Sequence, residues 1–114
     1  MDMLPKTTRQ ILKIARDTYG EKNQILVAIE ELNELACICA KFPRYESKDK
    51  AVDELREKVI DELADVCIVM DHIQAIFWVT DTDIWERAMK KGERVARWLK
   101  TSKSMEQTTR DRKV

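Results

Sequence analysis

Glycine and proline are nearly absent from this chain, and their scarcity limits what it can fold into. The 114 residues include only two glycines and two prolines. Strands must be joined by turns, and tight turns depend on these two residue types. Charged residues make up 37% of the chain, which is typical of helices with solvent-facing sides. An all-α fold is therefore expected, and the length fits a single domain.

The first helix is expected between Thr7 and Gly20. Thr7 and Gln10 have the spacing of a capping box, and Gly20 supplies a stop. The residues that share one face at helical spacing are Ile11, Ile14, Ala15 and Thr18. This face is expected to pack against the rest of the protein.

Three further helices follow. The second is expected over residues 23–41, and because 12 of the 16 residues from 25 to 40 are apolar, it should be buried on nearly every side. Pro43 and the charged run after it predict a loop. The third helix is expected over residues 49–79, with a polar first part and an apolar second part. The fourth opens with Asp83 and Glu86 in a second capping arrangement and ends near Leu99.

The domain is expected to comprise residues 1–100. Residues 101–114 are polar and lack periodicity, so this stretch is expected to be disordered. Four helices joined by short loops predict a bundle. The second and third helices have more apolar surface than one chain of this kind covers, so the bundle should be completed by homo-oligomerisation, as a homodimer or a homotetramer.

The overall charge balance argues against nucleic acid and membranes as partners. The chain has 21 basic and 21 acidic residues, so no net field draws it onto a polyanion. No apolar run approaches the length of a membrane span, and residues 1–10 lack the pattern of a signal peptide. A cytoplasmic location is expected. The three cysteines, Cys37, Cys39 and Cys67, are expected to be reduced core residues.

Two carboxylate pairs interrupt the most apolar helices. Glu31 and Glu34 are three residues apart, as are Glu62 and Asp65, so each pair lies on one face of its helix. If these helices pack together, the four carboxylates converge, and protonation or a multivalent cation must relieve their repulsion. Mg²⁺ fits best, with Mn²⁺ as a substitute, because it prefers oxygen ligands and also binds substrate phosphates. The alternative is an exposed acidic stripe on a surface helix.

Three polar residues near these pairs have open roles. Glu30, four residues before Glu34, is either a further ligand or a base that orients an attacking water. Gln24 lies seven residues before Glu31 on nearly the same face, where it either contacts a base or ribose or is exposed to solvent. His72 continues the carboxylate face of the third helix, and a packing residue with a satisfied hydrogen bond is preferred there to a substrate contact.

The order EELNE then ELAD, with 27 residues between Glu34 and Glu62, resembles the E-E-x-x-E…E-x-x-D signature of the all-α nucleoside triphosphate pyrophosphohydrolases, the superfamily of MazG-like proteins. The likeness covers residues 24–98. It implies a MazG-like helical bundle that dimerises or tetramerises. It also implies Mg²⁺-dependent hydrolysis of a (deoxy)nucleoside triphosphate to the monophosphate and pyrophosphate, with nucleotide-pool sanitation as a role. The metal ligands of the motif correspond to Glu31, Glu34, Glu62 and Asp65, and its leading acid to Glu30.

The same family commonly has Lys-Asn and a following Arg in its last helix, which are thought to hold the triphosphate. The corresponding stretch here is MKKGERVARW, in which Lys91 and Arg94 match and Gly92 replaces the usual Asn. That departure weakens the assignment of a phosphate site and is consistent with a different substrate. The two cations either meet a phosphate or belong to an ordinary solvated face.

Two other functions compete with the pyrophosphohydrolase. A non-catalytic helical oligomerisation or interaction module, whose glutamates pair with lysines of a partner, would show no metal dependence. A di-iron carboxylate bundle would use Glu-x-x-His pairs, and here Asp65 stands in the position of the histidine. In the pyrophosphohydrolase, Glu30 or Glu34 is expected to orient a water that a bound cation activates.

Overall fold

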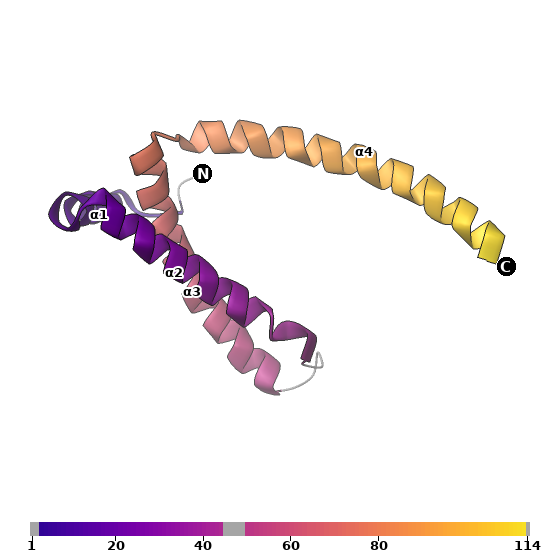
Figure 1. The fold of residues 1–114 in the computed structure, drawn as a ribbon, viewed down its shortest axis with the longest axis horizontal. Helices are drawn as coiled ribbons and strands as arrows, with labels where there is room; N and C mark the ends of the chain where they lie inside the picture. Colours follow the sequence, from indigo (N-terminus) through magenta and orange to yellow (C-terminus); the bar gives the residue numbers. More distant parts are fainter. Residues whose placement is uncertain (1–2, 45–49, 114) are drawn as a thin grey trace. The chain divides into compact units, whose positions relative to one another are not determined.

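The secondary structure is helical, as the composition predicts. A computed structural model describes the backbone of residues 3–44 and 50–113. Figure 1 shows its elements in chain order: α1 (Lys6–Tyr19), α2 (Glu21–Cys39), a 3-10 turn η1 (Phe42–Arg44), α3 (Lys50–Phe77) and α4 (Asp81–Lys113). The chain divides into two units, Met1–Val79 and Thr80–Val114, and each is described by itself. The all-α prediction is confirmed, whereas the four-helix bundle and its oligomerisation stay predictions.

Helix α1 begins earlier than expected and ends where expected. It starts at Lys6 with Pro5 at the cap position and no side-chain cap, so the predicted Thr7 capping box is wrong. Proline suits this place because its fixed φ is already close to that of a helix. At the other end Gly20 has φ 89° and its N–H bonds to the carbonyl of Arg16 at 2.9 Å. A side chain would be strained at this φ, which explains the glycine.

The packed face of α1 differs from the predicted one. Ile11 and Ile14 are exposed, and Leu12 is the buried apolar residue of this helix. Arg16 lies on the packed side, where it bonds to residues of α3. Apolar periodicity missed this face because an arginine forms part of it.

Helices α2 and α3 pack along each other and form the main core of the first unit. Among the residues whose side chains the structure describes, the buried apolar ones are Leu12, Ala28, Leu55, Val66 and Val69. Only Gln24 and Ala28 are buried in α2, so the prediction of a helix buried on nearly every side is wrong for the single chain. Two of the expected core cysteines, Cys37 and Cys39, are also exposed, although all three thiols are free.

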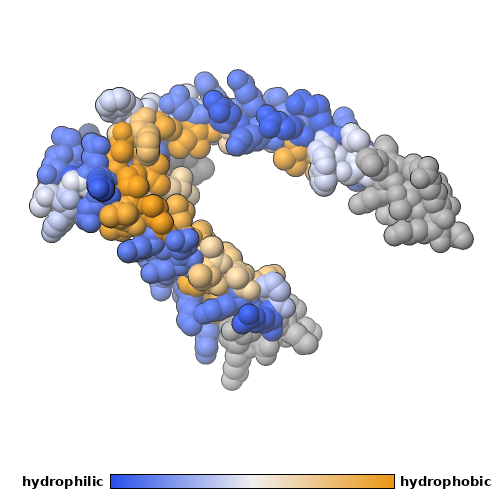
Figure 2. Space-filling model, viewed as in Figure 1, coloured by the Kyte–Doolittle hydropathy of each residue, from blue (hydrophilic) through white to orange (hydrophobic). Residues whose placement is uncertain are grey.

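A set of large apolar side chains remains exposed on the α2–α3 pair. Figure 2 shows hydrophobic residues gathered over α2 and the later part of α3. We name as the hairpin face the residues Leu26, Ile29 and Leu32 of α2 and Ile60, Leu63, Met70 and Phe77 of α3, which are 41–63% exposed. The residues of α3 in this set recur at intervals of three and seven, as on one side of a helix. Residues 45–49, in the predicted loop before α3, lie outside the described residues.

Helix α4 forms the described part of the second unit. It opens with a capping box formed by Thr80 and Asp83: the Thr80 N–H donates to Asp83 Oδ2 at 2.9 Å, and the Asp83 N–H donates to Thr80 Oγ1 at 3.0 Å. The box therefore lies three residues before the predicted pairing of Asp83 with Glu86. The helix then continues through the stretch expected to be disordered, as far as Lys113, since no glycine or proline follows residue 92 to end it.

A helix that crosses a bilayer must be both long and predominantly apolar. Within the described part of the chain, none of the helices combines the length and the hydrophobicity of a membrane span. Only α3 and α4 taken together, as two helices separated by a break, meet the test, and they do so by length and composition alone.

Candidate metal centre

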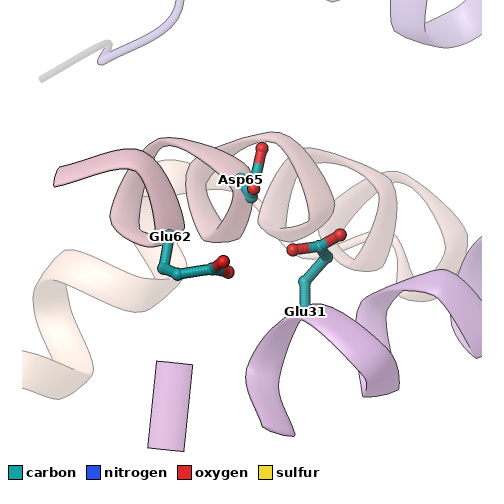
Figure 3. Close-up of side chains that lie close together, drawn as sticks. All are labelled: Glu31, Glu62 and Asp65. Atoms are coloured by element: carbon teal, nitrogen blue, oxygen red, sulfur yellow. The ribbon is translucent and has the colours of Figure 1, made fainter. Parts of the chain in front are cut away.

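Packing of α2 on α3 brings three carboxylates together. Glu31 of α2 and Glu62 and Asp65 of α3 each offer an oxygen within 4.8 Å of the others. In Figure 3 the side chains of Glu31 and Glu62 extend toward one another across the helix pair, and Asp65 lies one turn further along α3. Three of the four predicted metal ligands therefore form one group.

Two oxygens of this group have unmet hydrogen-bonding capacity. Within residues 3–44 and 52–103, the Oε2 atoms of Glu31 and Glu62 are buried and accept no hydrogen bond. An ionised carboxylate can only accept, so two of them cannot satisfy each other without a shared proton. A buried acceptor without a donor is costly. A cation bound to the two Oε2 atoms would remove that cost. The unsatisfied oxygens of Glu31 and Glu62 therefore fit a metal site.

The pKa values of the two glutamates in this group are raised, because both carboxylates are partly buried and close to other negative charges. Burial, and after it the charges of Glu34, Asp65 and Glu62, together raise the pKa of Glu31 from 4.5 to about 7. Burial also raises the pKa of Glu62, and Glu34 and Asp65 add to this effect. Without a cation, Glu31 is thus partly protonated near neutral pH, whereas a cation would favour the ionised form of the group.

Glu34 and Glu30 are placed differently. Glu34 is exposed, and its charge acts on both Glu31 and Glu62, so it borders the group. Glu30 is exposed and does not belong to the group of three. Of the two predicted catalytic residues, Glu34 is therefore the nearer to the carboxylate group.

Two polar residues on the same helices are buried. Gln24 is only 7% exposed, so the interpretation of it as a solvent-facing residue of the first turn is wrong. His72 is 3% exposed, and its Nδ1 lies 3.0 Å from Arg16 Nη1. The guanidinium can only donate, so Nδ1 accepts and the ring proton is on Nε2. Burial and the Arg16 charge lower the pKa of His72, and its contact with Arg16 makes it a packing residue between α1 and α3.

Sequence reasoning missed the polar network that includes this histidine. Arg16 Nη1 also donates to Asp71 Oδ2 at 3.1 Å, and Arg9 Nε is 3.8 Å from Asp71 Oδ1. The signal available in the sequence was a pair of arginines at helical spacing in α1 and an Asp-His pair in α3. This network joins α1 to α3, and none of its residues belongs to the carboxylate group.

The predicted phosphate-binding residues are on α4, in the other unit. Lys91 and Arg94 are both exposed and three residues apart, so they share a side of the helix. A Cβ added at Gly92 would meet no atom within 4 Å. The Asn that is usual in the resembled family would therefore fit here, and packing among the described residues does not explain the glycine.

The hairpin face lies away from the carboxylate group. Consecutive helical residues are about 100° apart, which places Leu63 about 100° from Glu62 and Ile29 about 160° from Glu31. A partner that covers the hairpin face would therefore leave the carboxylates accessible.

Comparison with known proteins yields no relative of this chain. A scan against protein-family models, a search of curated proteins and a search of solved structures each found no match.

Proposed function

We propose that this protein is a Mg²⁺-dependent nucleoside triphosphate pyrophosphohydrolase, which converts a (deoxy)nucleoside triphosphate to the monophosphate and pyrophosphate. The observation that carries the proposal is the group of Glu31, Glu62 and Asp65, with a buried, unsatisfied oxygen on each glutamate. The order and spacing of these residues also resemble the signature of that superfamily.

The donor set suits a hard cation. Glu31, Glu62 and Asp65 would hold it, with Glu34 as a fourth ligand, and all of them offer only oxygen, which Mg²⁺ and Mn²⁺ accept. The group contains no histidine or cysteine, which argues against zinc and against a di-iron site. A bound ion would neutralise phosphate charge and lower the pKa of a water.

The chain's own residues then have separate tasks. Asp65 and Glu34 are exposed, so a triphosphate would reach the group from their side. Glu34 accepts a hydrogen bond from the attacking water and orients it, with Glu30 as the second choice because it lies outside the group. Water adds to one phosphorus of the α–β anhydride and gives up a proton to the solvent through Glu34. The bond from that phosphorus to the bridging oxygen breaks, and the products are the monophosphate and pyrophosphate.

Substrate contacts away from the reacting phosphorus are assigned to three residues. Lys91 and Arg94 would bind the triphosphate, since their charges and spacing suit phosphate oxygens. Gln24 would contact the nucleoside, because it lies two helical turns, about 10.5 Å, from Glu31 along α2. Homo-oligomers are proposed because the hairpin face exposes seven large apolar side chains.

One other function has an observation in its favour. The exposed hairpin face and the exposed apolar residues of α4 also suit a non-catalytic oligomerisation or interaction module. Such a module would be indifferent to Mg²⁺ and to chelators, whereas the proposed enzyme would not.

The test is a panel of ribo- and deoxynucleoside triphosphates with Mg²⁺, in which pyrophosphate and orthophosphate are measured separately. Native protein and Asp61→Asn should release pyrophosphate, and Glu62→Gln should not. Asp61 is the matched control because it is an exposed carboxylate next to Glu62. Absence of pyrophosphate release from every nucleotide, or equal release by Glu62→Gln, would overturn the proposal.

A further inference from the structure

A second exposed apolar surface lies on α4. We name as the α4 stripe the residues Ile84, Trp85, Met89, Val95, Trp98 and Leu99, which are 39–64% exposed. Their helical spacing places them on one side of α4. An isolated helix gains little stability from propensity alone and depends on burial of its apolar side. The stripe therefore indicates a surface that becomes covered.

Basic residues border the α4 stripe. Arg87, Lys91 and Arg94 recur at intervals of four and three, so they follow one edge of it. All three are exposed. Residues 84–103 contain seven basic and two acidic side chains, which makes this part of the helix strongly positive.

The hairpin face has the opposite charge at its borders. Glu30 lies one turn after Leu26 on α2, and Asp53 and Glu57 precede Ile60 on α3 at helical spacing. These three acids are exposed. Together α2 and α3 contain eleven acidic and four basic residues. The net charge of zero for the whole chain thus conceals an acidic helix pair and a basic helix, each with an exposed apolar side.

The connection between α3 and α4 favours a partner outside the chain. It consists of three residues, Trp78 to Thr80. Trp78 has φ 55°, a left-handed conformation that is costly for a bulky side chain. A short, strained connection of this kind disfavours a tight turn in which the next helix folds back on its own chain. It favours exchange of that helix between two copies of the protein.

We propose that α4 of one copy docks through its stripe on the hairpin face of a second copy, in a reciprocal exchange. The basic border formed by Arg87, Lys91 and Arg94 meets the acidic borders at Glu30 and Asp53. The assignment rests on apolar exposure, charge and the strained connection. Lys91, Arg94 and Glu30 also have roles in the proposed enzyme, so the test measures the mass of the protein and not its activity.

The test uses the full chain and three double variants. The arm variant is Lys91→Glu with Arg94→Glu, and the hairpin variant is Glu30→Lys with Asp53→Lys. The control is Lys90→Glu with Arg97→Glu, which makes the same change of charge on the side of α4 opposite the stripe. Light scattering after size exclusion gives the mass, and circular dichroism the helix content.

Native protein and the control variant should have about twice the 13.4 kDa mass of one chain. Each of the other two variants should dissociate, with a dissociation constant raised about tenfold or more by facing like charges. A mixture of the arm and hairpin variants should form a mixed dimer, because both of its contacts then join opposite charges. This rescue also shows that the two variants are folded.

Three results would overturn the proposal. A monomeric native protein would show that a second copy does not cover these apolar surfaces. If that monomer bound anionic phosphatidylglycerol vesicles but not neutral ones, the partner would be a lipid surface instead. An arm variant that dimerises as tightly as the control would place the interface elsewhere. Failure of the mixed variants to associate would exclude exchange between copies.

Discussion

Arg16 Nη1 lies 3.1 Å from a carboxylate oxygen of Asp71 and 3.0 Å from Nδ1 of the adjacent His72. A single nitrogen thus joins the end of α1 to two consecutive side chains of α3. Because His72 is almost fully buried, removal of the arginine would leave a buried acceptor and a partly buried carboxylate without this donor.

We expect Arg16→Ala to lower the free energy of unfolding by about 1–3 kcal/mol, the usual cost of leaving a buried polar group unsatisfied. Urea unfolding followed by circular dichroism measures this change. Lys13→Ala, on the exposed side of the same helix, should change stability by less than about 0.5 kcal/mol. Equal effects of the two substitutions would contradict the structural role of the network.

The core of the first unit should respond to truncation where the structure buries a side chain. Leu55→Ala should cost about 2–5 kcal/mol, because Leu55 is 6% exposed and its removal leaves a cavity. Ile11→Ala removes a side chain that is 64% exposed and should cost much less. Denaturant midpoints give both values, and the reverse ranking would show that the expected Ile11 face of α1 is the packed one after all.

Between pH 6.5 and 8, metal-free protein should lose stability as the pH rises. The pKa of Glu31 is raised from 4.5 to about 7 in the folded state, so its favourable contribution is present below 4.5 and is lost as the pH passes 7. The contribution of His72 to stability has the opposite pH dependence. Its pKa is lowered from 6.5, so that contribution is present above pH 6.5 and is lost as the pH falls below it. Above pH 6.5 the glutamate effect should therefore dominate.

Melting temperatures test this pH dependence. Native protein in a chelator should melt a few degrees lower at pH 8 than at pH 6.5, and millimolar Mg²⁺ should restore most of the loss. Glu31→Gln should reduce the slope, whereas Glu30→Gln, in an exposed neighbour, should retain it in full. A slope that is unchanged in Glu31→Gln would contradict the assignment.

The start of α4 depends on the Thr80–Asp83 capping box. Thr80→Ala should destabilise the first turn by about 0.5–2 kcal/mol, and Thr82→Ala, within the same turn, should have a smaller effect. The hydrogen bond from the Thr80 backbone N–H has the largest effect on the pKa of Asp83 and lowers it from 3.8; the hydrogen bond with the Thr80 hydroxyl lowers it further. Its contribution is present above pH 3.8 and is lost as the pH falls through the lowered value. Amide exchange at residues 81–84 measures both effects, and equal protection in the two variants would exclude the box.

The sequence alone determined the features that depend on neighbouring residues in the chain. The helical fold followed from the scarcity of glycine and proline, and the pairing of Glu31 with Glu34 and of Glu62 with Asp65 followed from helical spacing. Local competition still misled the prediction of caps, since Thr80, Asp83 and Glu86 offer two boxes of equal spacing and hydrogen bonds select the first.

Only the tertiary structure decided which residues lie inside. Burial depends on which helix covers a face, and that contact joins residues far apart in the chain. Packing of α2 on α3 buries one oxygen each of Glu31 and Glu62 and leaves Glu30 in solvent. Packing of α1 on α3 buries His72 against Arg16. Periodicity places a side chain on one side of its own helix, but whether a neighbouring helix covers that side is decided by packing over the whole unit.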